Sequence, residues 1–153
     1  ASDEGGGLFL YSSSMNVSGV VTVSKNMASD EGGGIYLDSS SMDLSGVVTV
    51  SKNVASLHGG GLYLYDSSGQ LSGEVAVLDN TAGEHGGGFF IDTSSINLSG
   101  VVTVSNNLAN KYGGGLYLYS SSTGELSGEV AVRDNTANYY GGGLFLHSSS
   151  MDR

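Results

Sequence analysis

The stretch SNNLANKYGGGLYLYSSS, residues 105–122, decides the fold because the chain repeats it with small changes along its whole length. Two earlier copies read SKNMASDEGGGIYLDSSS, residues 24–41, and LDNTAGEHGGGFFIDTSS, residues 78–95. The Gly triplet stands at one place in every copy, beginning at Gly5, Gly32, Gly59, Gly86, Gly113 and Gly141. The spacing is 27 residues four times and then 28, and a constant period of this size is the signature of a solenoid.

Each repeat shows the alternation of β-strands and lacks the period of a helix. Residues 116–119 read LYLY, so aliphatic side chains face one way and aromatic ones the other. Residues 20–24 read VVTVS, and their counterparts at 74–78 read EVAVL. Because Glu and Ala replace the first Val and the Thr while the alternate valines are kept, those valines are the inward pair. A shorter third strand is expected around the aliphatic residue before each Ser-Gly pair: Val17, Leu44, Leu71, Leu98 and Leu126.

Three short strands and three turns in 27 residues predict one coil of an all-β parallel β-helix, or β-solenoid. Successive coils would stack at about 4.8 Å, which places each residue over its counterpart. Two inward columns follow: Leu8, Ile35, Leu62, Phe89, Leu116 and Leu144, and then Leu10, Leu37, Leu64, Ile91, Leu118 and Leu146. A column at one turn suits a buried ladder of amides: Asn26, Asn53, Asn80, Asn107 and Asn135.

The repeats predict a single solenoid segment over residues 1–153, with coils beginning near residues 1, 28, 55, 82, 109 and 137. About 5.5 coils are expected, and neither the first nor the last repeat has the atypical sequence of a capping unit. An uncapped solenoid exposes core and unpaired strand edges. We therefore expect either an excerpt from a longer array or subunits that stack end to end.

Composition and charge exclude several classes of protein. Cys is absent, which excludes a disulfide scaffold and a thiolate metal site, and 26 Gly without any Pro argue against collagen. The net charge is −10, from 15 acidic and 5 basic residues. Nucleic acid is therefore not an expected partner, because its phosphates require Lys and Arg. No apolar run approaches the roughly 18 residues that span a bilayer, so membrane insertion is not expected.

The repeat carries a family resemblance in the segment VSNNLANKYGGGLYL, residues 104–118. Asn107, Ala109 two residues later, and then Gly-Gly with an aliphatic residue resemble the repeats of chlamydial polymorphic outer-membrane proteins. Those repeats carry Phe-x-x-Asn and Gly-Gly-Ala-Ile motifs; here Val104 stands at the Phe position and Gly replaces the Ala. The resemblance covers the whole chain and implies a right-handed, pectin-lyase-like parallel β-helix in a large secreted or surface protein, often an adhesin. It transfers no catalytic residue.

A column of aromatic residues is the strongest candidate for a contact face. Its members share one outward position of the first strand in each coil. Stacked rings on a sheet stabilise neighbouring coils, and a contiguous apolar face also binds other chains or sugar rings. The predicted contact-face residues are Phe9, Tyr36, Tyr63, Phe90, Tyr117 and Phe145.

The sequence favours no metal, cofactor or catalytic site. His58 and His85 occupy one repeat position on adjacent coils, with Glu31 and Glu84 nearby, and such a set could hold a divalent metal. We favour a simpler interpretation, an exposed corner whose residues drift without selection as ligands. The Gly triplets are followed by neither Lys-Ser or Lys-Thr nor a helix, which argues against a phosphate-binding loop.

These patterns together predict a non-enzymatic structural protein, located outside the cell or at its surface. We expect the rigid rod of a filament, appendage or adhesin, in contact with copies of itself, with neighbouring parts of a larger chain, or with glycans. Polysaccharide lyases use this fold with a basic catalytic residue and a cleft of long loops, whereas every complete coil here has 27 or 28 residues, so no cleft is expected.

Two alternatives stay open. One is a glycan-binding or polysaccharide-processing β-helix. The other is an ice-binding solenoid, which the Thr-bearing VVTVS strands suggest, although residues 74–78 and 129–133 bring charges into that array.

Overall fold

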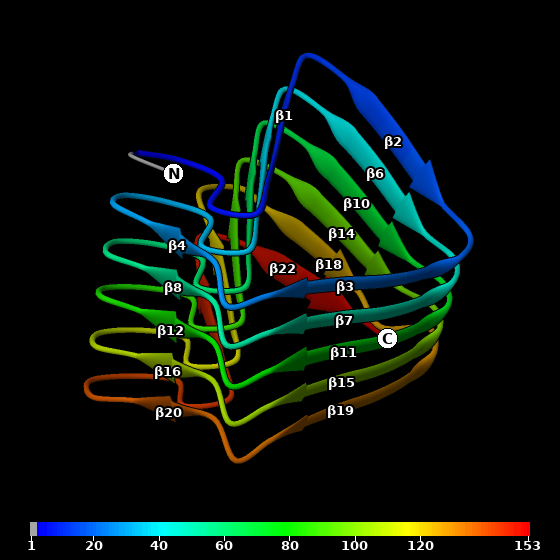
Figure 1. Cartoon of the computed structure of the whole chain (residues 1–153). Coiled ribbons are helices and arrows are strands. Elements are labelled where there is room, and N and C mark those ends of the chain that lie inside the picture. The colour runs from blue at the N-terminus through cyan, green and yellow to red at the C-terminus, as the bar shows by residue number, and fades with distance from the viewer. Residues whose placement is uncertain (1–2) are drawn as a thin grey trace.

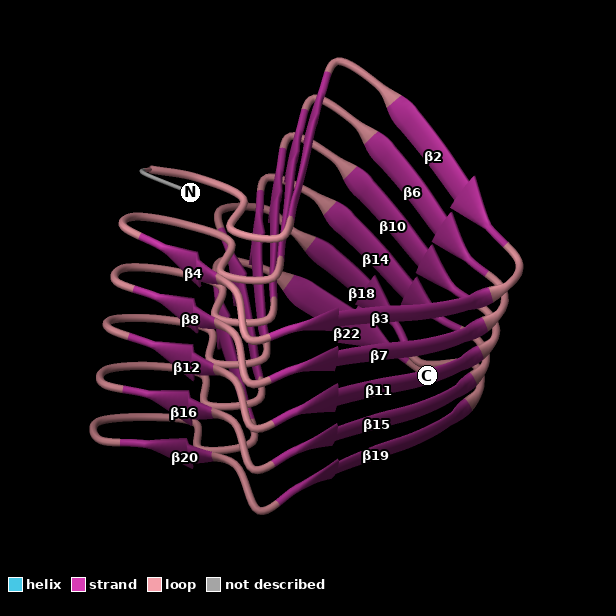
Figure 2. Cartoon of the chain, viewed as in Figure 1, coloured by secondary structure: helices cyan, strands magenta, loops and turns pink. Residues whose placement is uncertain are grey.

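A computed structural model describes residues 3–153 as a stack of coils built from 22 short β-strands (Figures 1 and 2). This part of the chain forms no helix, and so none that is long and apolar enough to cross a membrane. Corresponding strands of successive coils pair in parallel, which confirms the predicted all-β parallel solenoid.

Four sheets run along the stack, one more than the sequence predicted. Sheet A contains the strands after the Gly triplets: β1 (Leu8–Tyr11), β5 (Ile35–Asp38), β9 (Leu62–Tyr65), β13 (Phe89–Asp92), β17 (Leu116–Tyr119) and β21 (Leu144–His147). Sheet B follows it: β2 (Ser14–Val17), β6 (Ser41–Leu44), β10 (Ser68–Leu71), β14 (Ser95–Leu98), β18 (Thr123–Glu125) and β22 (Ser150–Asp152). These two sheets correspond to the first and third predicted strands.

Sheet C corresponds to the predicted VVTVS strands: β3 (Val20–Ser24), β7 (Val47–Ser51), β11 (Glu74–Leu78), β15 (Val101–Ser105) and β19 (Glu129–Arg133). Sheet D was not predicted, because its strands are only two residues long: β4 (Met27–Ala28), β8 (Val54–Ala55), β12 (Thr81–Ala82), β16 (Leu108–Ala109) and β20 (Thr136–Ala137). It forms an arm that projects from the body of the solenoid, at the left of Figure 1.

The register runs without a slip through all four sheets, and the one additional residue is absorbed in a turn. Tyr119 still pairs with Asp92, 27 residues earlier, whereas Thr123 pairs with Ser95, 28 residues earlier. Between these pairs Ser120 and Ser121 both have positive φ, 55° and 65°. A turn can take an inserted residue in this way because it lies outside the ladders.

The predicted core columns lie inside the space that sheets A, B and C enclose. Leu116 and Leu118 are completely buried, as are most of their counterparts in the middle coils. In the outermost coil the equivalent Leu144 and Leu146 are 37% and 38% exposed, because no further coil covers them. Stacking of coils, more than closure of any single coil, therefore removes this apolar surface from water.

The Gly triplet fits the chain closely between the arm and sheet A. Gly86, at the first position, has a φ of +66°, which other residues rarely adopt. At the second position, a Cβ on Gly87 would lie 2.5 Å from the carbonyl oxygen of Gly114 and 2.6 Å from that of Leu108. Backbone of the next coil occupies the space of a side chain there, so only Gly is accommodated.

Candidate functional site

The predicted aromatic column exists, and we call it the aromatic stripe: Phe9, Tyr36, Tyr63, Phe90, Tyr117 and Phe145. Its rings stack from coil to coil, with centroids 5.2 Å apart for Phe9–Tyr36 and 4.9 Å apart for Tyr36–Tyr63. The stripe is not an exposed face, however. Its four central members are only 4–5% exposed, whereas Phe9 in the first coil is 46% exposed. The prediction that these residues form an outward contact face is wrong for the four central members.

A second column covers the stripe. It consists of the residues before the Gly triplets, which pair in parallel through isolated bridges, and we call it the corner column: Glu31, His58, His85, Tyr112 and Tyr140. The ring of His58 stacks on Phe90 with centroids 4.8 Å apart, and Tyr112 contacts Phe145 at 5.2 Å. The arm therefore folds back onto sheet A and buries a small second core. The expected exposed corner is instead half-buried at both histidines.

His58, His85 and Glu84 come together beside this second core. Each offers one ligand atom, and these three atoms lie within 4.8 Å of one another. The imidazoles are stacked, with centroids 4.9 Å apart and planes 6° from parallel. Oε2 of Glu84 lies 3.8 Å from Nε2 of His85, while Oε1 of the same carboxylate accepts a hydrogen bond of 2.6 Å from Nζ of Lys111.

Burial keeps the two histidines neutral. It lowers the pKa of His58, and burial followed by the proximity of His58 lowers the pKa of His85 to about 4. The hydrogen bond from Lys111 lowers the pKa of Glu84, so this carboxylate is ionised at neutral pH. Nδ1 of each imidazole is buried without a hydrogen-bond partner. A neutral imidazole with a free nitrogen is the form in which His ligates metals.

Glu31, the next residue of the corner column, has the opposite character. Burial raises its pKa to about 7, and the nearby carboxylates of Glu4, Asp30 and Asp92 add to the effect. Burial also raises the pKa of Tyr117 in the aromatic stripe to about 12. The tyrosine is therefore a neutral ring at physiological pH, and Glu31 is partly protonated there.

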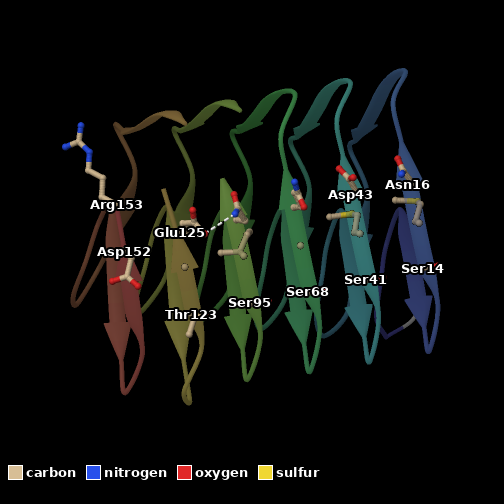
Figure 3. A pocket seen from close by; sticks show the side chains of 17 residues that line it. Ser14, Asn16, Ser41, Asp43, Ser68, Ser95, Thr123, Glu125, Asp152 and Arg153 are labelled. Carbon is tan, nitrogen blue, oxygen red and sulfur yellow. Dashed lines mark hydrogen bonds between the residues drawn. The ribbon is translucent and has the colours of Figure 1, made fainter. Parts of the chain in front are cut away.

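A polar groove of about 830 Å³ follows the surface of sheet B from β2 to β22, where no cleft was expected (Figure 3). No long loop builds it; it lies over two columns of polar side chains. They are Ser14, Ser41, Ser68, Ser95 and Thr123, and beside them Asn16, Asp43, Gln70, Asn97, Glu125 and Asp152. Asn97 Nδ2 donates a hydrogen bond of 3.1 Å to Oε2 of Glu125. The alternate polar positions of the third predicted strand were the signal for this groove.

The array that suggested ice binding is interrupted as the sequence indicated. Glu74 lies between Val47 and Val101 in the register of sheet C, and Ala76 lies between Thr49 and Thr103. A regular surface of Val and Thr therefore does not extend over more than two adjacent coils among β3 to β19.

Comparison with known proteins assigns the family. Residues 2–153 match the family described as periplasmic copper-binding protein (NosD). The chain belongs to the NosD family. The periplasmic location in the description supports the coarser part of the predicted extracellular or surface location, a place outside the cytoplasm, and gives no support to the cell surface in particular. The match also supports the coarser part of the resemblance, an exported protein with β-helix repeats, and gives no support to the chlamydial family in particular.

No curated protein and no solved structure matches the chain. The copper in the NosD description can be compared with the donor atoms of the cluster. Imidazole and carboxylate are donor types that bind copper, but the rings of His58 and His85 are stacked with planes 6° from parallel, so their in-plane nitrogen lone pairs do not converge on one ion.

Proposed function

We propose that the chain is a non-enzymatic structural segment, the rigid shaft of an extracellular filament, appendage or surface adhesin. The observation that carries this proposal is the unbroken register of sheets A to D across successive coils. Backbone hydrogen bonds of the ladders point along the axis of the stack, so the five complete coils are held to one another by all four sheets. In a long rod of this kind the continuous strand ladders themselves resist bending and stretching.

The buried Asn ladder reinforces each junction between coils. Nδ2 of Asn53 donates a hydrogen bond of 3.0 Å to Oδ1 of Asn80, and the same arrangement joins Asn107 to Asn135 at 2.9 Å. These side chains also satisfy backbone groups inside the turn. Such contacts support the proposal of a shaft, because they recur at each junction between coils and join the coils without a bound ligand.

Further coils or a second copy of the chain would cover the two ends of the stack. The outermost strands, β1 to β4 at one end and β19 to β22 at the other, each have only one hydrogen-bonded neighbour. Leu144 and Leu146 are also exposed there although their column is buried elsewhere. An edge of this kind pairs readily with another strand of the same register.

Electron microscopy of the purified chain tests self-assembly. We expect filaments whose axial repeat equals a whole number of coils of about 4.8 Å. Leu146→Lys should abolish them, because it places a charge on the stacking surface, whereas Tyr65→Lys, at an exposed position in a central coil, should not. Rods of single-chain length only, in wild type as well, would contradict self-assembly.

Glycan binding is a second candidate, and the groove on sheet B favours it. Hydroxyl, amide and carboxylate groups recur along it once per coil, and Oδ1 of Asp43 and Oδ1 of Asn97 are buried without a hydrogen-bond partner. An extended glycan presents hydroxyl groups at regular intervals, which matches the recurrence of polar groups along the groove. The carboxylates of Asp43, Glu125 and Asp152 favour a neutral glycan over an acidic one.

Calorimetry with neutral oligosaccharides tests this candidate. Asn97→Ala should weaken binding, whereas Asn110→Ala, at an exposed position of the arm, should leave it unchanged. Equal loss in both variants, or no heat with wild type, would contradict a glycan site in the groove. Ice binding has less support because of the interruption at Glu74, and an absence of thermal hysteresis would dispose of it.

A further inference from the structure

A column of tyrosines and carboxylates on sheet A belongs neither to the aromatic stripe nor to the groove on sheet B. It occupies the last position of the strands, two residues after the stripe, and we call it the tyrosine–aspartate column. In register from coil to coil it reads Tyr11, Asp38, Tyr65, Asp92 and Tyr119. The three tyrosines are 64%, 43% and 37% exposed, whereas the central rings of the stripe are buried. Exposed rings therefore recur at every second coil, and a carboxylate lies between each two of them.

We propose that this column binds quaternary ammonium groups, one beside each aspartate. Asp38 lies between Tyr11 and Tyr65, and Asp92 lies between Tyr65 and Tyr119. Because strands of successive coils are about 4.8 Å apart, the two tyrosines on either side of an aspartate are about 9.6 Å apart. A cation midway between them is about 4.8 Å from each ring, within the roughly 6 Å over which the face of an aromatic ring attracts a cation.

The ring of Tyr119 has the orientation that such binding requires. Its plane is 16° from that of His147 in the next coil and 21° from that of Phe90 in the preceding coil, with centroids 5.2 Å and 6.3 Å apart. The two faces of this ring therefore point along the stack, one of them toward the coil that carries Asp92. A cation beside Asp92 meets the negative face of the ring and not its positive edge. Tyr65 holds the same register position two coils earlier, and as an exposed side chain it is free to take the same orientation.

The two carboxylates supply the charge that favours a cation. Oδ1 of Asp38 accepts a hydrogen bond of 2.8 Å from the hydroxyl of Ser39, and Oδ1 of Asp92 accepts one of 3.0 Å from the hydroxyl of Thr93. Each carboxylate is thus held through one oxygen, and neither forms an ion pair with Lys or Arg within residues 3–153. A negative charge without a counter-ion, placed between two rings, attracts a positive group and repels a phosphate or a carboxylate.

Spacing and hydration select a quaternary ammonium over the cations of Arg and Lys. A planar guanidinium in contact with two rings holds them about 7–8 Å apart, which is less than the spacing of two coils. A primary ammonium is compact and strongly hydrated, so it is costly to remove from water. The methyl groups of a quaternary ammonium make it wide and prevent it from donating hydrogen bonds to water, and aromatic rings are its usual binding partners in proteins.

Calorimetric titration of the full chain with choline is the test. We expect two equivalents to bind, and the neutral carbon analogue 3,3-dimethylbutan-1-ol to bind about tenfold more weakly, because the rings and carboxylates attract the charge. Tyr65→Ala removes the ring that both positions share and should abolish binding, whereas Tyr65→Phe keeps the ring and should retain binding within about twofold. The matched control is Tyr139→Ala, which changes a 66% exposed tyrosine after β20 and should leave binding unchanged.

Asp92→Asn should weaken one of the two equivalents about tenfold and leave the other unchanged. Its control is Asp134→Asn, which makes the same change of net charge at an exposed position after β19. Equal affinity for choline and its neutral analogue, a comparison that needs only the wild-type chain, would show a general apolar surface and overturn the proposal. Undiminished binding by Tyr65→Ala, or methylammonium that binds as tightly as choline, would overturn it as well.

Discussion

Asn80 is joined to Asn107 of the next coil by two hydrogen bonds to the same oxygen. Oδ1 of Asn107 accepts from the backbone N–H of Asn80 at 2.9 Å and from its Nδ2 at 3.0 Å. Nδ2 of Asn80 also donates to the carbonyl oxygen of Val50, and Oδ1 of Asn80 accepts from Asn53 in the same way. A completely buried amide is thus satisfied by groups on both neighbouring coils.

Replacement of Asn80 by Ala should lower the free energy of unfolding by about 3 kcal/mol, because the backbone N–H of Asn53 and the carbonyl of Val50 lose their buried partner. Urea denaturation followed by circular dichroism measures the loss. The exposed Asn110→Ala should change stability by less than about 0.5 kcal/mol. A similar, small effect of both variants would mean that the Asn ladder is not buried.

Substitution by Ala should have different effects on stability at two of the glycines, Gly87 and Gly69. A Cβ on Gly87 meets backbone atoms of Gly114 and Leu108 at 2.5–2.6 Å, so Gly87→Ala should cost about 3 kcal/mol or more. At Gly69 the nearest atom is the flexible tip of Leu64 at 3.0 Å. Gly69→Ala should therefore be neutral or stabilise the protein by about 0.5 kcal/mol, since Ala also reduces the conformational entropy of the unfolded chain. Thermal unfolding of both proteins makes the comparison, and the reverse order would contradict the packing around the triplet.

Burial of the aromatic stripe predicts a large cost for truncating its central ring. Phe90 packs against His58, Tyr63 and Tyr117 with centroids 4.8–5.1 Å apart. Phe90→Ala should therefore lower stability by about 3–4 kcal/mol. Tyr11→Ala, at an exposed position of β1, should cost less than about 1 kcal/mol. Equal, small losses of unfolding free energy in both variants, measured by chemical denaturation, would show that the aromatic stripe is exposed and that the arm does not pack on sheet A.

The columns were predictable because a solenoid converts sequence period directly into register. Once Gly86 and Gly113 are aligned, Phe89 must lie over Leu116, and the pairing shows this. The inward face of sheet C followed from the charge at Glu74, since an unpaired carboxylate in an apolar core is too costly. The Asn ladder followed from one residue type at one turn position.

Burial of the stripe was not predictable by the same reasoning. Alternation correctly placed Phe90 on the outer face of its strand, but the cover comes from a turn that folds back from sheet D. The sequence signal for this cover was the aromatic character of the corner column at His58 and Tyr112, whose rings pack against the rings of the aromatic stripe. The groove was not predicted for a related reason: clefts in this fold are expected from long loops, whereas polar columns such as that of Asp43 line this groove directly on a sheet.

Glu31 should give stability a dependence on pH that Glu31→Gln removes. Burial, with help from Glu4, Asp30 and Asp92, raises its pKa to about 7 in the folded chain, above its ordinary value of 4.5. The folded state therefore binds the proton more tightly than the unfolded state does. The contribution is fully present below about pH 4.5 and is lost as the pH rises through about 7.

The measurement is the difference in unfolding free energy between wild type and Glu31→Gln at pH 5 and pH 8. Wild type should lose about 1 kcal/mol more than the variant over this range, a value reduced for screening of a half-buried group. The difference is needed because His85 acts in the opposite direction. Its lowered pKa of about 4 makes the folded state lose stability as the pH falls below about 6.5. A difference that does not change between pH 5 and pH 8 would show that Glu31 is solvated and that the corner column does not bury it.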